Sequence, residues 1–426
     1  MLVIADDLSG AADCGVACVR EGLRSQVVFG TIEGQIDSDV LAVDVDSRHL
    51  DPRTAAIETA RIIRWYSREQ SPLVFKKVDS TLRGNFASEL AAAVEVHRDS
   101  ARPAQQKSVT IFAPAFPAQG RTTRDGIQLL NGRRLEQSDM AESSVTPRQN
   151  ILEAFQLAGL RSALVKLELV RSGVDVLRDA MSSMTAETDL LVCDAETDID
   201  LRSVAIAASA LGPEVLWAGS AGLAYHVPSA AGLKPASYSQ VDVPLAQGPT
   251  LFVIGSLSSV SRAQARMVRS MPEVITVEFA PEVLLAGPLS ARWRQQAYKL
   301  EQSLSTGRDV IVLTGNESST GGPEAWQIKS SLAQLIAPCA EIVGALVATG
   351  GETARAVLQA WGVGRLDLVG ELEAGLPLLV TAEWHRNLLV CTKAGGFGKP
   401  ETLQRCRQFL RNIDRSSSAR LYPWKG

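Results

Sequence analysis

Residues Leu73 to Val96 read LVFKKVDSTLRGNFASELAAAVEV, and this stretch decides the predicted fold. Leu73–Phe75 is a short apolar run that predicts a buried strand, and the alanine-rich Phe86–Val96 predicts a helix. Charged and hydroxyl side chains lie between them, where the strand ends and the helix begins: Lys76, Lys77, Asp79, Ser80, Thr81 and Arg83. In open α/β sheets, ligands bind beyond the carboxyl ends of the strands. The free N–H groups of the helix start suit an anion, although a solvated loop with a good cap would have the same composition.

The rest of the chain repeats this alternation of short apolar strands and helices. In the first half, strands are predicted at Leu2–Ala5, Gln26–Phe29, Val40–Val45, Val109–Ala113, Leu164–Leu167, Leu190–Cys193 and Val215–Ala218, with further helices at Ala11–Glu21 and Thr54–Arg68. In the second half they are predicted at Leu251–Ile254, Val274–Val277, Val310–Leu313, Ala345–Ala348, Leu378–Leu379 and Leu388–Cys391. Continuous apolar runs are typical of strands covered on both faces. We therefore predict an α/β protein with two α/β domains, each with a mostly parallel, doubly wound sheet.

A segment rich in proline, serine and glycine separates the two halves. Residues 227–250 carry four prolines and interrupt the alternation of strands and helices. We predict an N-terminal domain at residues 1–228, a linker at 229–249, a C-terminal domain at 250–412 and a polar tail at 413–426.

Composition excludes several classes of partner. The 426 residues carry a net charge of −4, which gives no reason to expect nucleic acid. No run reaches the roughly 18 apolar residues of a membrane span, and the N-terminus MLVIADDLSG has no basic region or cleavage site of a signal peptide. The six cysteines and four histidines show no spacing typical of zinc ligands, so we predict no metal centre of their making. We expect a cytoplasmic protein.

Polar clusters follow several predicted strands of the first half. Asp6 and Asp7 could hold hydroxyls or act as a general base, or one of them could simply cap the next helix. Arg48 could grip a carboxylate in bidentate fashion, or lie on the surface. Arg121 follows a proline-stiffened turn. Together with the polar residues of the stretch Leu73–Val96, these residues favour a small, anionic, hydroxyl-rich substrate.

Glycines and hydroxyls follow the strands of the second half. Three turns have this composition, and their candidate nucleotide-binding residues are Ser256, Ser258, Gly350, Gly351, Glu352, Thr353, Gly395 and Gly396. Glycine turns at helix starts expose backbone N–H groups that cradle phosphate, although plain turn chemistry is the commoner use. Glu352 could bind magnesium through water or cap its own helix. With a sugar-like site in one domain and a phosphate cradle in the other, the sequence favours phosphoryl transfer in an active site at the interdomain cleft.

Seven motifs resemble the four-carbon acid sugar kinases over about residues 1–410. They are IADDLSGAAD from Ile4, KKVDSTLRGN from Lys76, APAFPAQGRTTRDG from Ala113, WAGSAGLA from Trp217, GSLSSVSRAQ from Gly255, TGGETA from Thr349 and KAGGFG from Lys393. The resemblance implies a sugar-acid-binding domain, a nucleotide-binding domain, and phosphorylation of the terminal hydroxyl of a tetronate by ATP with Mg²⁺. The form KKVDSTLRG is closer to the D-threonate and D-erythronate kinases than to the 3-oxo-tetronate kinases.

The resemblance also implies roles for single residues. ATP contacts are expected at Ser258, Gly350–Thr353 and Gly396, and substrate contacts at Asp6 or Asp7, Arg48, Lys77, Asp79, Ser80, Arg83 and Arg121. We expect Asp79 or Asp7 to orient the substrate hydroxyl and accept its proton. The substrate carboxylate or the transferred phosphoryl group would be held by four cations: Lys77, Arg83, Arg48 and Arg121. A dinucleotide-dependent oxidoreductase acting on a sugar acid and a non-catalytic sugar-acid sensor remain alternatives. A homodimer is compatible with the sequence.

Overall fold

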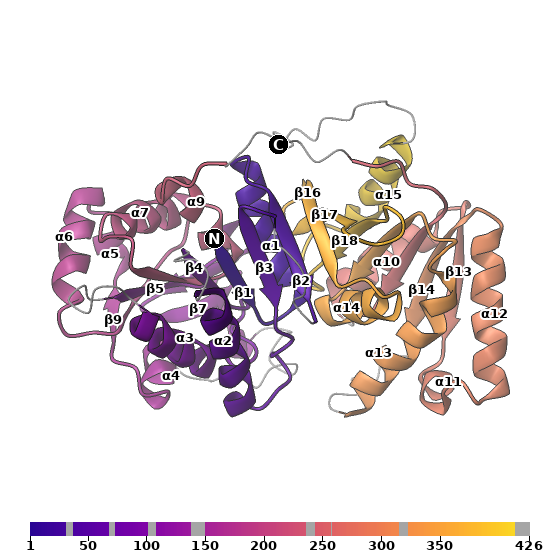
Figure 1. The fold of residues 1–426 in the computed structure, drawn as a ribbon, viewed down its shortest axis with the longest axis horizontal. Helices are drawn as coiled ribbons and strands as arrows, with labels where there is room; N and C mark the ends of the chain where they lie inside the picture. Colours follow the sequence, from indigo (N-terminus) through magenta and orange to yellow (C-terminus); the bar gives the residue numbers. More distant parts are fainter. Residues whose placement is uncertain are drawn as a thin grey trace. The chain divides into compact units, whose positions relative to one another are not determined.

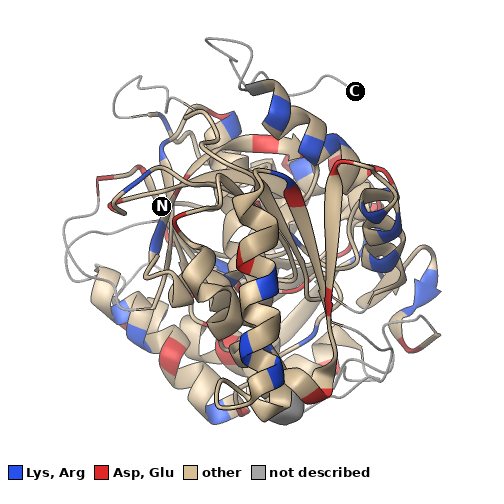
Figure 2. Ribbon diagram, turned by 90° about the vertical axis from the view of Figure 1, so that its right-hand side faces the viewer, with Lys and Arg blue, Asp and Glu red and all other residues tan. Residues whose placement is uncertain are grey.

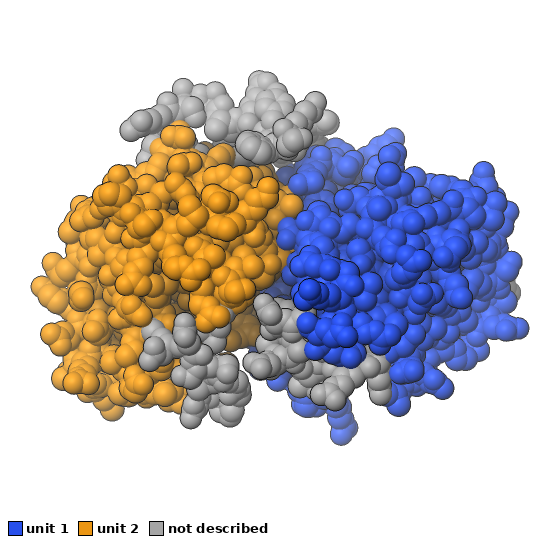
Figure 3. All heavy atoms as spheres, turned by 180° about the vertical axis from the view of Figure 1, so that it is seen from behind, with its two compact units in different colours: residues 1–25, 33–238 blue, residues 26–32, 239–426 orange. Residues whose placement is uncertain are grey.

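The computed structural model describes residues 1–30, 37–67, 73–100, 108–137, 150–235, 243–256, 258–314 and 323–413 (Figure 1). The chain forms two compact units, which Figure 3 shows in different colours. Unit 1 comprises Met1–Ser25 and Glu33–Tyr238, and unit 2 comprises Gln26–Ile32 and Ser239–Gly426. The predicted tail from residue 414 onward lies outside the described residues.

Unit 1 is organised around a parallel sheet. Its strand order is β3 (Val40–Asp44), β1 (Leu2–Ala5), β4 (Val74–Lys77), β11 (Val215–Gly219), β5 (Val109–Ala113), β10 (Leu190–Cys193) and β9 (Ser162–Val165). Every strand except β9 is buried along its whole length, as expected for strands with helices on both faces.

Helices connect these strands. They are α1 (Leu8–Arg20), α2 (Pro52–Ser67), α3 (Phe86–Ser100), α4 (Ile151–Leu157), α5 (Leu167–Val170), α6 (Val174–Met184), α7 (Asp198–Ser209), α8 (Ala221–Ala224) and α9 (Val227–Ala230). The strand predicted at Leu164–Leu167 ends earlier, at Val165, because Lys166 is the N-cap of α5.

A small antiparallel sheet in unit 1 was not predicted. It consists of β6 (Arg121–Arg124), β7 (Ile127–Leu130) and β8 (Arg133–Arg134). Its two tight turns are Asp125–Gly126 and Asn131–Gly132, and all four of these residues have positive φ. Asp-Gly and Asn-Gly pairs between apolar residues are the strongest short-range signal for a hairpin.

Unit 2 is organised around a mixed sheet. Its parallel part has the order β13 (Val274–Phe279), β14 (Asp309–Thr314), β12 (Thr250–Ile254), β15 (Ala345–Thr349) and β18 (Leu389–Lys393). The antiparallel strands β17 (Leu376–Thr381), β16 (Arg365–Glu373) and β2 (Ser25–Phe29) continue it. The strand expected at Gln26–Phe29 therefore pairs with β16 of unit 2, with Gln26 Nε2 donating to Asp367 Oδ1 at 2.8 Å.

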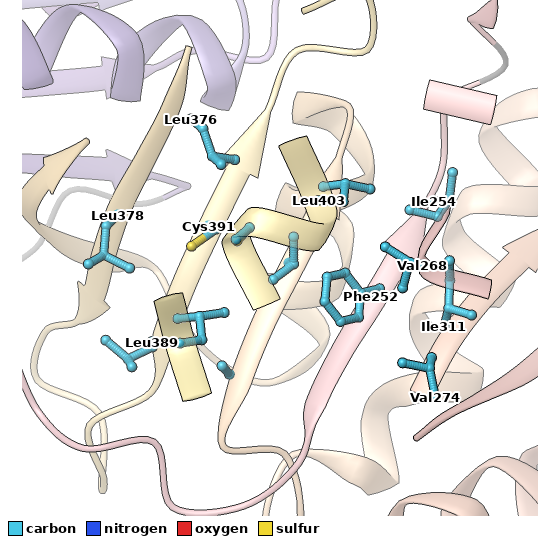
Figure 4. Packing of buried hydrophobic residues seen from close by; sticks show 14 of the residues in the cluster. Phe252, Ile254, Val268, Val274, Ile311, Leu376, Leu378, Leu389, Cys391 and Leu403 are labelled. Atoms are coloured by element: carbon cyan, nitrogen blue, oxygen red, sulfur yellow. The ribbon is translucent and has the colours of Figure 1, made fainter. Parts of the chain in front are cut away.

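The core of unit 2 lies between this sheet and its helices. These are α10 (Ser259–Arg269), α11 (Pro281–Ala286), α12 (Ala291–Ser305), α13 (Pro323–Ile336), α14 (Gly351–Ala360) and α15 (Thr402–Ile413). Figure 4 shows Phe252 of β12 and Cys391 of β18 in one cluster with Leu403 of α15. Fully buried Asp309 ties α15 to this core, because it accepts hydrogen bonds from Arg407 and Arg411.

Both sheets have a switch point at which the strand order reverses. In unit 1 the chain places β3 on one side of β1 and β4 on the other. In unit 2 it places β14 on one side of β12 and β15 on the other. Ligands of open α/β sheets bind at such points, beyond the carboxyl ends of the strands.

Charged residues of both signs lie on the surface (Figure 2), and the cysteines lie in the interior. Figure 2 shows acidic and basic residues interspersed over the helices in view. All six cysteines are buried and free. No helix of the described residues has the length and apolar character needed to cross a membrane.

Candidate active site

Three strand ends of unit 1 bring the predicted polar residues together. Asp6 and Asp7 follow β1, the loop carrying Arg48 follows β3, and Lys77 and Asp79 lie at the end of β4. Asp7 is the N-cap of α1, and its Oδ1 accepts the Gly10 N–H at 2.8 Å. Asp7 is thus a cap, and its second oxygen is directed to the rest of the cluster.

Arg48 is the centre of this cluster. Its Nε lies 2.8 Å from Asp6 Oδ2, its Nη1 lies 2.8 Å from Asp7 Oδ2, and its Nη2 lies 3.8 Å from Asp79 Oδ1. The side chain is only 15% exposed. One guanidinium therefore joins the ends of β1 and β4, which rules out the alternative of a loose surface arginine.

The backbone around Arg48 is held by Asn85. Asn85 Nδ2 donates to Ser47 O at 3.1 Å and to Leu50 O at 2.8 Å. Gly84 has a φ of 79°, and a Cβ there would lie 3.3 Å from Arg48 Cγ. Asn85 thus holds the loop that carries Arg48 through hydrogen bonds, and Gly84 leaves room for the Arg48 side chain.

Asp79 is paired with Arg83 in bidentate geometry. Arg83 Nε lies 2.8 Å from Asp79 Oδ2, and Arg83 Nη2 lies 2.8 Å from Asp79 Oδ1. The Oδ2 atom also accepts hydrogen bonds from the hydroxyl and the N–H of Thr81. The turn after β4 is therefore closed by the Asp79 carboxylate.

Two adjacent lysines at the end of β4 have different environments. Lys76 is fully buried and pairs with Glu89 of α3, with Nζ 2.7 Å from Oε2. Lys77 is directed toward the acidic cluster, because a Cβ on Gly10 would lie 2.8 Å from both Lys77 Nζ and Asp7 Oδ1. Lys76 is thus a structural residue, and Lys77 belongs to the site.

Charge pairing determines the protonation of this cluster. Burial alone would raise the pKa of Asp79, but the Arg83 guanidinium, with Arg48 and Lys77, holds that pKa well below its usual range. Arg48 likewise outweighs burial and lowers the pKa of Asp6. Burial would lower the pKa of Lys77, yet Cys14 and the surrounding carboxylates keep it above its ordinary value. Asp6 and Asp79 are therefore carboxylates at neutral pH, and Arg48 and Lys77 are cations.

The unpredicted hairpin contacts the turn that follows β4. Arg121 begins β6 and is buried; burial lowers its pKa, and the Asp79 carboxylate partly offsets this. Gln128 of β7 donates to Ser80 O at 2.7 Å and to Pro114 O at 3.2 Å. Gln128 was missed in the sequence, and the Asp125–Gly126 turn is the signal that would have placed it opposite Thr123.

Three glycine turns of unit 2 follow β12, β15 and β18. Ser258 is the N-cap of α10 and accepts the Ser261 N–H at 3.0 Å. Its hydroxyl also donates to Gly395 O at 2.6 Å, which joins the first turn to the third. Gly395 packs so closely that a Cβ would lie 2.8 Å from Ser256 Cβ. The turn after β12, with Ser256 and Ser258, is therefore in direct contact with the turn after β18, with Gly395.

The second turn begins α14. Gly350 is its N-cap with a φ of 94°, a left-handed conformation that favours glycine, and no side chain caps the helix. Gly351 and Thr353 are buried, and a Cβ on Gly255 would lie 2.7 Å from Thr353 Cβ. The turns after β12 and β15 are thus in contact. A helix start of this kind leaves backbone N–H groups available to an anion.

Glu352 of the first turn of α14 forms an ion pair with Lys329 of α13. Among the described residues, no three His, Cys, Asp or Glu side chains gather in a way that could hold a metal ion. Glu352 could still hold magnesium through water, because this ion keeps most of its water and is bound largely through substrate phosphates.

Two family profiles match consecutive parts of the chain. The sugar-binding N-terminal domain matches residues 1–227, and the nucleotide-binding C-terminal domain matches residues 251–403. A protein named D-threonate kinase from Cupriavidus necator is 37% identical over 411 residues, which cover 94% of this chain and 96% of that protein. The chain belongs to the four-carbon acid sugar kinase family.

Other relatives in the four-carbon acid sugar kinase family align over similar lengths. A 3-oxo-tetronate kinase from Cupriavidus necator is 26% identical over 427 residues, covering 93% of this chain and 94% of that protein. The solved structure of a Salmonella typhimurium protein has a TM-score of 0.75 at 20% identity and covers 96% of this chain and 98% of that chain, which supports the fold alone. Membership makes the chain an ATP-dependent sugar-acid kinase, as predicted from the motifs, rather than an oxidoreductase or a sensor.

Proposed function

We propose that this kinase transfers the γ-phosphoryl group of magnesium-ATP to the terminal hydroxyl of D-threonate, with D-erythronate the next candidate and a 3-oxo-tetronate the third. The observation that carries the proposal is the cluster in which Arg48 pairs with Asp6, Asp7 and Asp79, with Lys77 close by. It combines hydrogen-bond acceptors for hydroxyls with cations for a carboxylate. The higher identity to a relative named D-threonate kinase, 37% against 26%, supports the order of the candidates.

The structure suggests different roles for the two candidate bases. Asp79 is engaged by Arg83 through both oxygens and has a depressed pKa, so we assign it to fixing the arginines. Asp7 makes one backbone and one guanidinium contact, and a carboxylate offers about four acceptor positions; we assign it to the acceptor hydroxyl. Lys77, Arg83 and Arg121 would hold the substrate carboxylate, and Ser80 would line the same turn.

Catalysis of this kind depends on positioning and charge neutralisation more than on base strength. Lys77 and Arg48 would offset the charge that accumulates near the acceptor. The glycine turns of unit 2 would hold the nucleotide through N–H groups, and Glu352 would hold magnesium through water, where the ion neutralises phosphate charge. Transfer requires both ligands within reach of each other, and we propose that closure of the two domains provides this.

The proposal is tested by measuring ATP consumption by the purified protein with each of several acids. The panel contains D-threonate, D-erythronate, L-threonate, L-erythronate and the 3-oxo acids, with and without magnesium. We expect D-threonate to give the highest kcat/KM and omission of magnesium to abolish turnover. Equal, low rates with all four-carbon acids would refute the substrate assignment.

Two further proposals concern the state of the protein. We propose a cytoplasmic enzyme, which the six free, buried thiols support. We also propose a homodimer, which light scattering of the purified chain tests directly.

A further inference from the structure

The third glycine turn is built around a buried ammonium group. Lys393, the last residue of β18, is 1% exposed. Its Nζ donates to three backbone carbonyls of the following turn, namely Ala394 O at 2.7 Å, Phe397 O at 3.0 Å and Gly395 O at 3.2 Å. A lysine buried to this degree among carbonyls fixes the direction of each of them, because each bond is charge-assisted.

Neighbouring side chains fix two of the same carbonyls. Gly395 O also accepts the Ser258 hydroxyl at 2.6 Å and the Ser261 hydroxyl at 2.8 Å. Phe397 O also accepts Gln264 Nε2 at 3.0 Å. The turn is therefore held by its carbonyl groups, from the side on which Lys393 and α10 lie.

The direction of these carbonyls determines where the N–H groups point. In a trans peptide, the C=O of one residue and the N–H of the next point in opposite directions. With the carbonyls of Ala394, Gly395 and Phe397 facing Lys393, the N–H groups of Gly395, Gly396 and Gly398 face away from it. Successive N–H groups on one side of a turn form a concavity that binds anions.

Lys393 also links this turn to the start of α14. Its own carbonyl accepts the Gly350 N–H at 2.8 Å. The residue therefore contacts both glycine turns that we propose to hold the nucleotide, while its ammonium remains buried beneath one of them.

We propose that Lys393 is a positioning residue for the nucleotide: its ammonium holds three carbonyls inward so that the N–H groups of Gly395, Gly396 and Gly398 point at the phosphates of ATP. It acts through the turn and does not itself contact the nucleotide. The inference rests on the proposed function in one respect, namely that the glycine turns of unit 2 bind ATP.

The test compares Lys393→Met with two other variants of the full-length protein. Lys393→Arg keeps a buried cation, and Lys399→Met removes an exposed lysine shortly after the same turn. For each protein we would measure the Kd for ADP by calorimetry, and the KM values for ATP and for D-threonate. We expect Lys393→Met to raise both the ADP Kd and the ATP KM by about tenfold or more, and to leave the D-threonate KM within about twofold.

The control variants separate positioning from other effects. Lys399→Met should change the ADP Kd by less than about twofold, and Lys393→Arg should recover part of the lost affinity. If Lys393→Met lowers Tm but binds ADP as tightly as the natural protein, the residue is merely structural and the proposal is overturned. If Lys399→Met weakens ADP as much as Lys393→Met does, general attraction by positive charge explains the effect and the proposal also falls.

A measurement on the unmodified protein covers the case in which Lys393→Met does not fold. Hydrogen exchange with and without ADP should show slower exchange in peptides that contain Gly395, Gly396 and Gly398. Unchanged exchange there, under conditions in which ADP binds, would overturn the proposal. Absence of turnover with every tetronate would instead refute the proposed substrate and leave the ADP comparison valid.

Discussion

The buried ion pair of Lys76 and Glu89 offers a quantitative test of how β4, which carries Lys77 of the candidate site, is held to α3. Lys76 Nζ lies 2.7 Å from Glu89 Oε2, and the two side chains are 0% and 1% exposed. Lys76→Met removes one charge at similar volume and leaves the Glu89 carboxylate buried without its partner. Removing one member of a buried pair costs about 3–5 kcal/mol. At about 2–4 °C per kcal/mol for a unit of this size, Tm should fall by roughly 6–20 °C.

The double variant Lys76→Met with Glu89→Leu separates charge burial from packing. Replacing a buried ion pair by apolar residues of similar volume is often neutral or stabilising, so we expect the double variant to recover most of the lost Tm. The assay is thermal unfolding of the full-length protein; if unit 1 binds D-threonate as proposed, this acid should identify the transition of unit 1 by shifting it upward. A loss of less than about 3 °C in Lys76→Met, or an equal loss in the double variant, would show that the pair does not hold β4 to α3.

Three further predictions concern the two sites. Asp7→Asn should lower kcat by about a hundredfold or more, with little change in the KM for ATP. Asp79→Asn should mainly raise the KM for the sugar acid, because it releases Arg83. Steady-state kinetics test both, and near-normal turnover in both variants would refute the assigned roles. Asp79 and Asp6 have depressed pKa values, so their contribution to stability is complete above the unfolded pKa of about 3.9 and is lost as pH falls through the lower folded values. The Tm of unit 1 should therefore change little between about pH 7 and pH 5 and fall below about pH 4, with a shallower fall in Asp79→Asn; an equal fall in both proteins would contradict this. Gly395→Ala places a methyl group 2.8 Å from Ser256 Cβ and should raise the KM for ATP about tenfold, and an unchanged KM would place the nucleotide elsewhere.

Much of the fold could be predicted because its strands are continuous apolar runs that end in polar residues. Val109–Ala113 and Leu190–Cys193 have the same bounds in the structure as in the sequence pattern. The strand of Arg365–Glu373 was missed, since its partly buried second half carries charges and lacks a continuous apolar run. Pairing of β2 with β16 could not be predicted either, because register between segments more than 300 residues apart depends on tertiary contacts.

The candidate site was predicted in composition but not in its pairing. The sequence placed Asp6, Asp7, Lys77 and Asp79 at strand ends. The structure brings the three aspartates together around Arg48 and places Lys77 near Asp7. The residue pattern alone does not separate Lys76 from Lys77, because two adjacent lysines at a strand end have the same pattern whichever face each side chain takes. The family resemblance was needed to single out Lys77. Gln128 and Lys393 were passed over because each acts on backbone carbonyls, which have no signature in the sequence.

The assignment of β2 to unit 2 affects how the chain is made and how it can be divided. Residues 26–32 are synthesised early, yet β16, the strand that β2 pairs with, follows more than 300 residues later. During translation β2 must therefore wait, without its final partner, until nearly the whole protein has left the ribosome. A gene fragment cut at the proline-rich segment would encode a nucleotide-binding half in which β16 is left as an unprotected edge strand, prone to pair with other chains. A fragment with residues 25–30 joined to its N-terminus through a flexible spacer would supply β2 again, and β2 would cover the edge of β16.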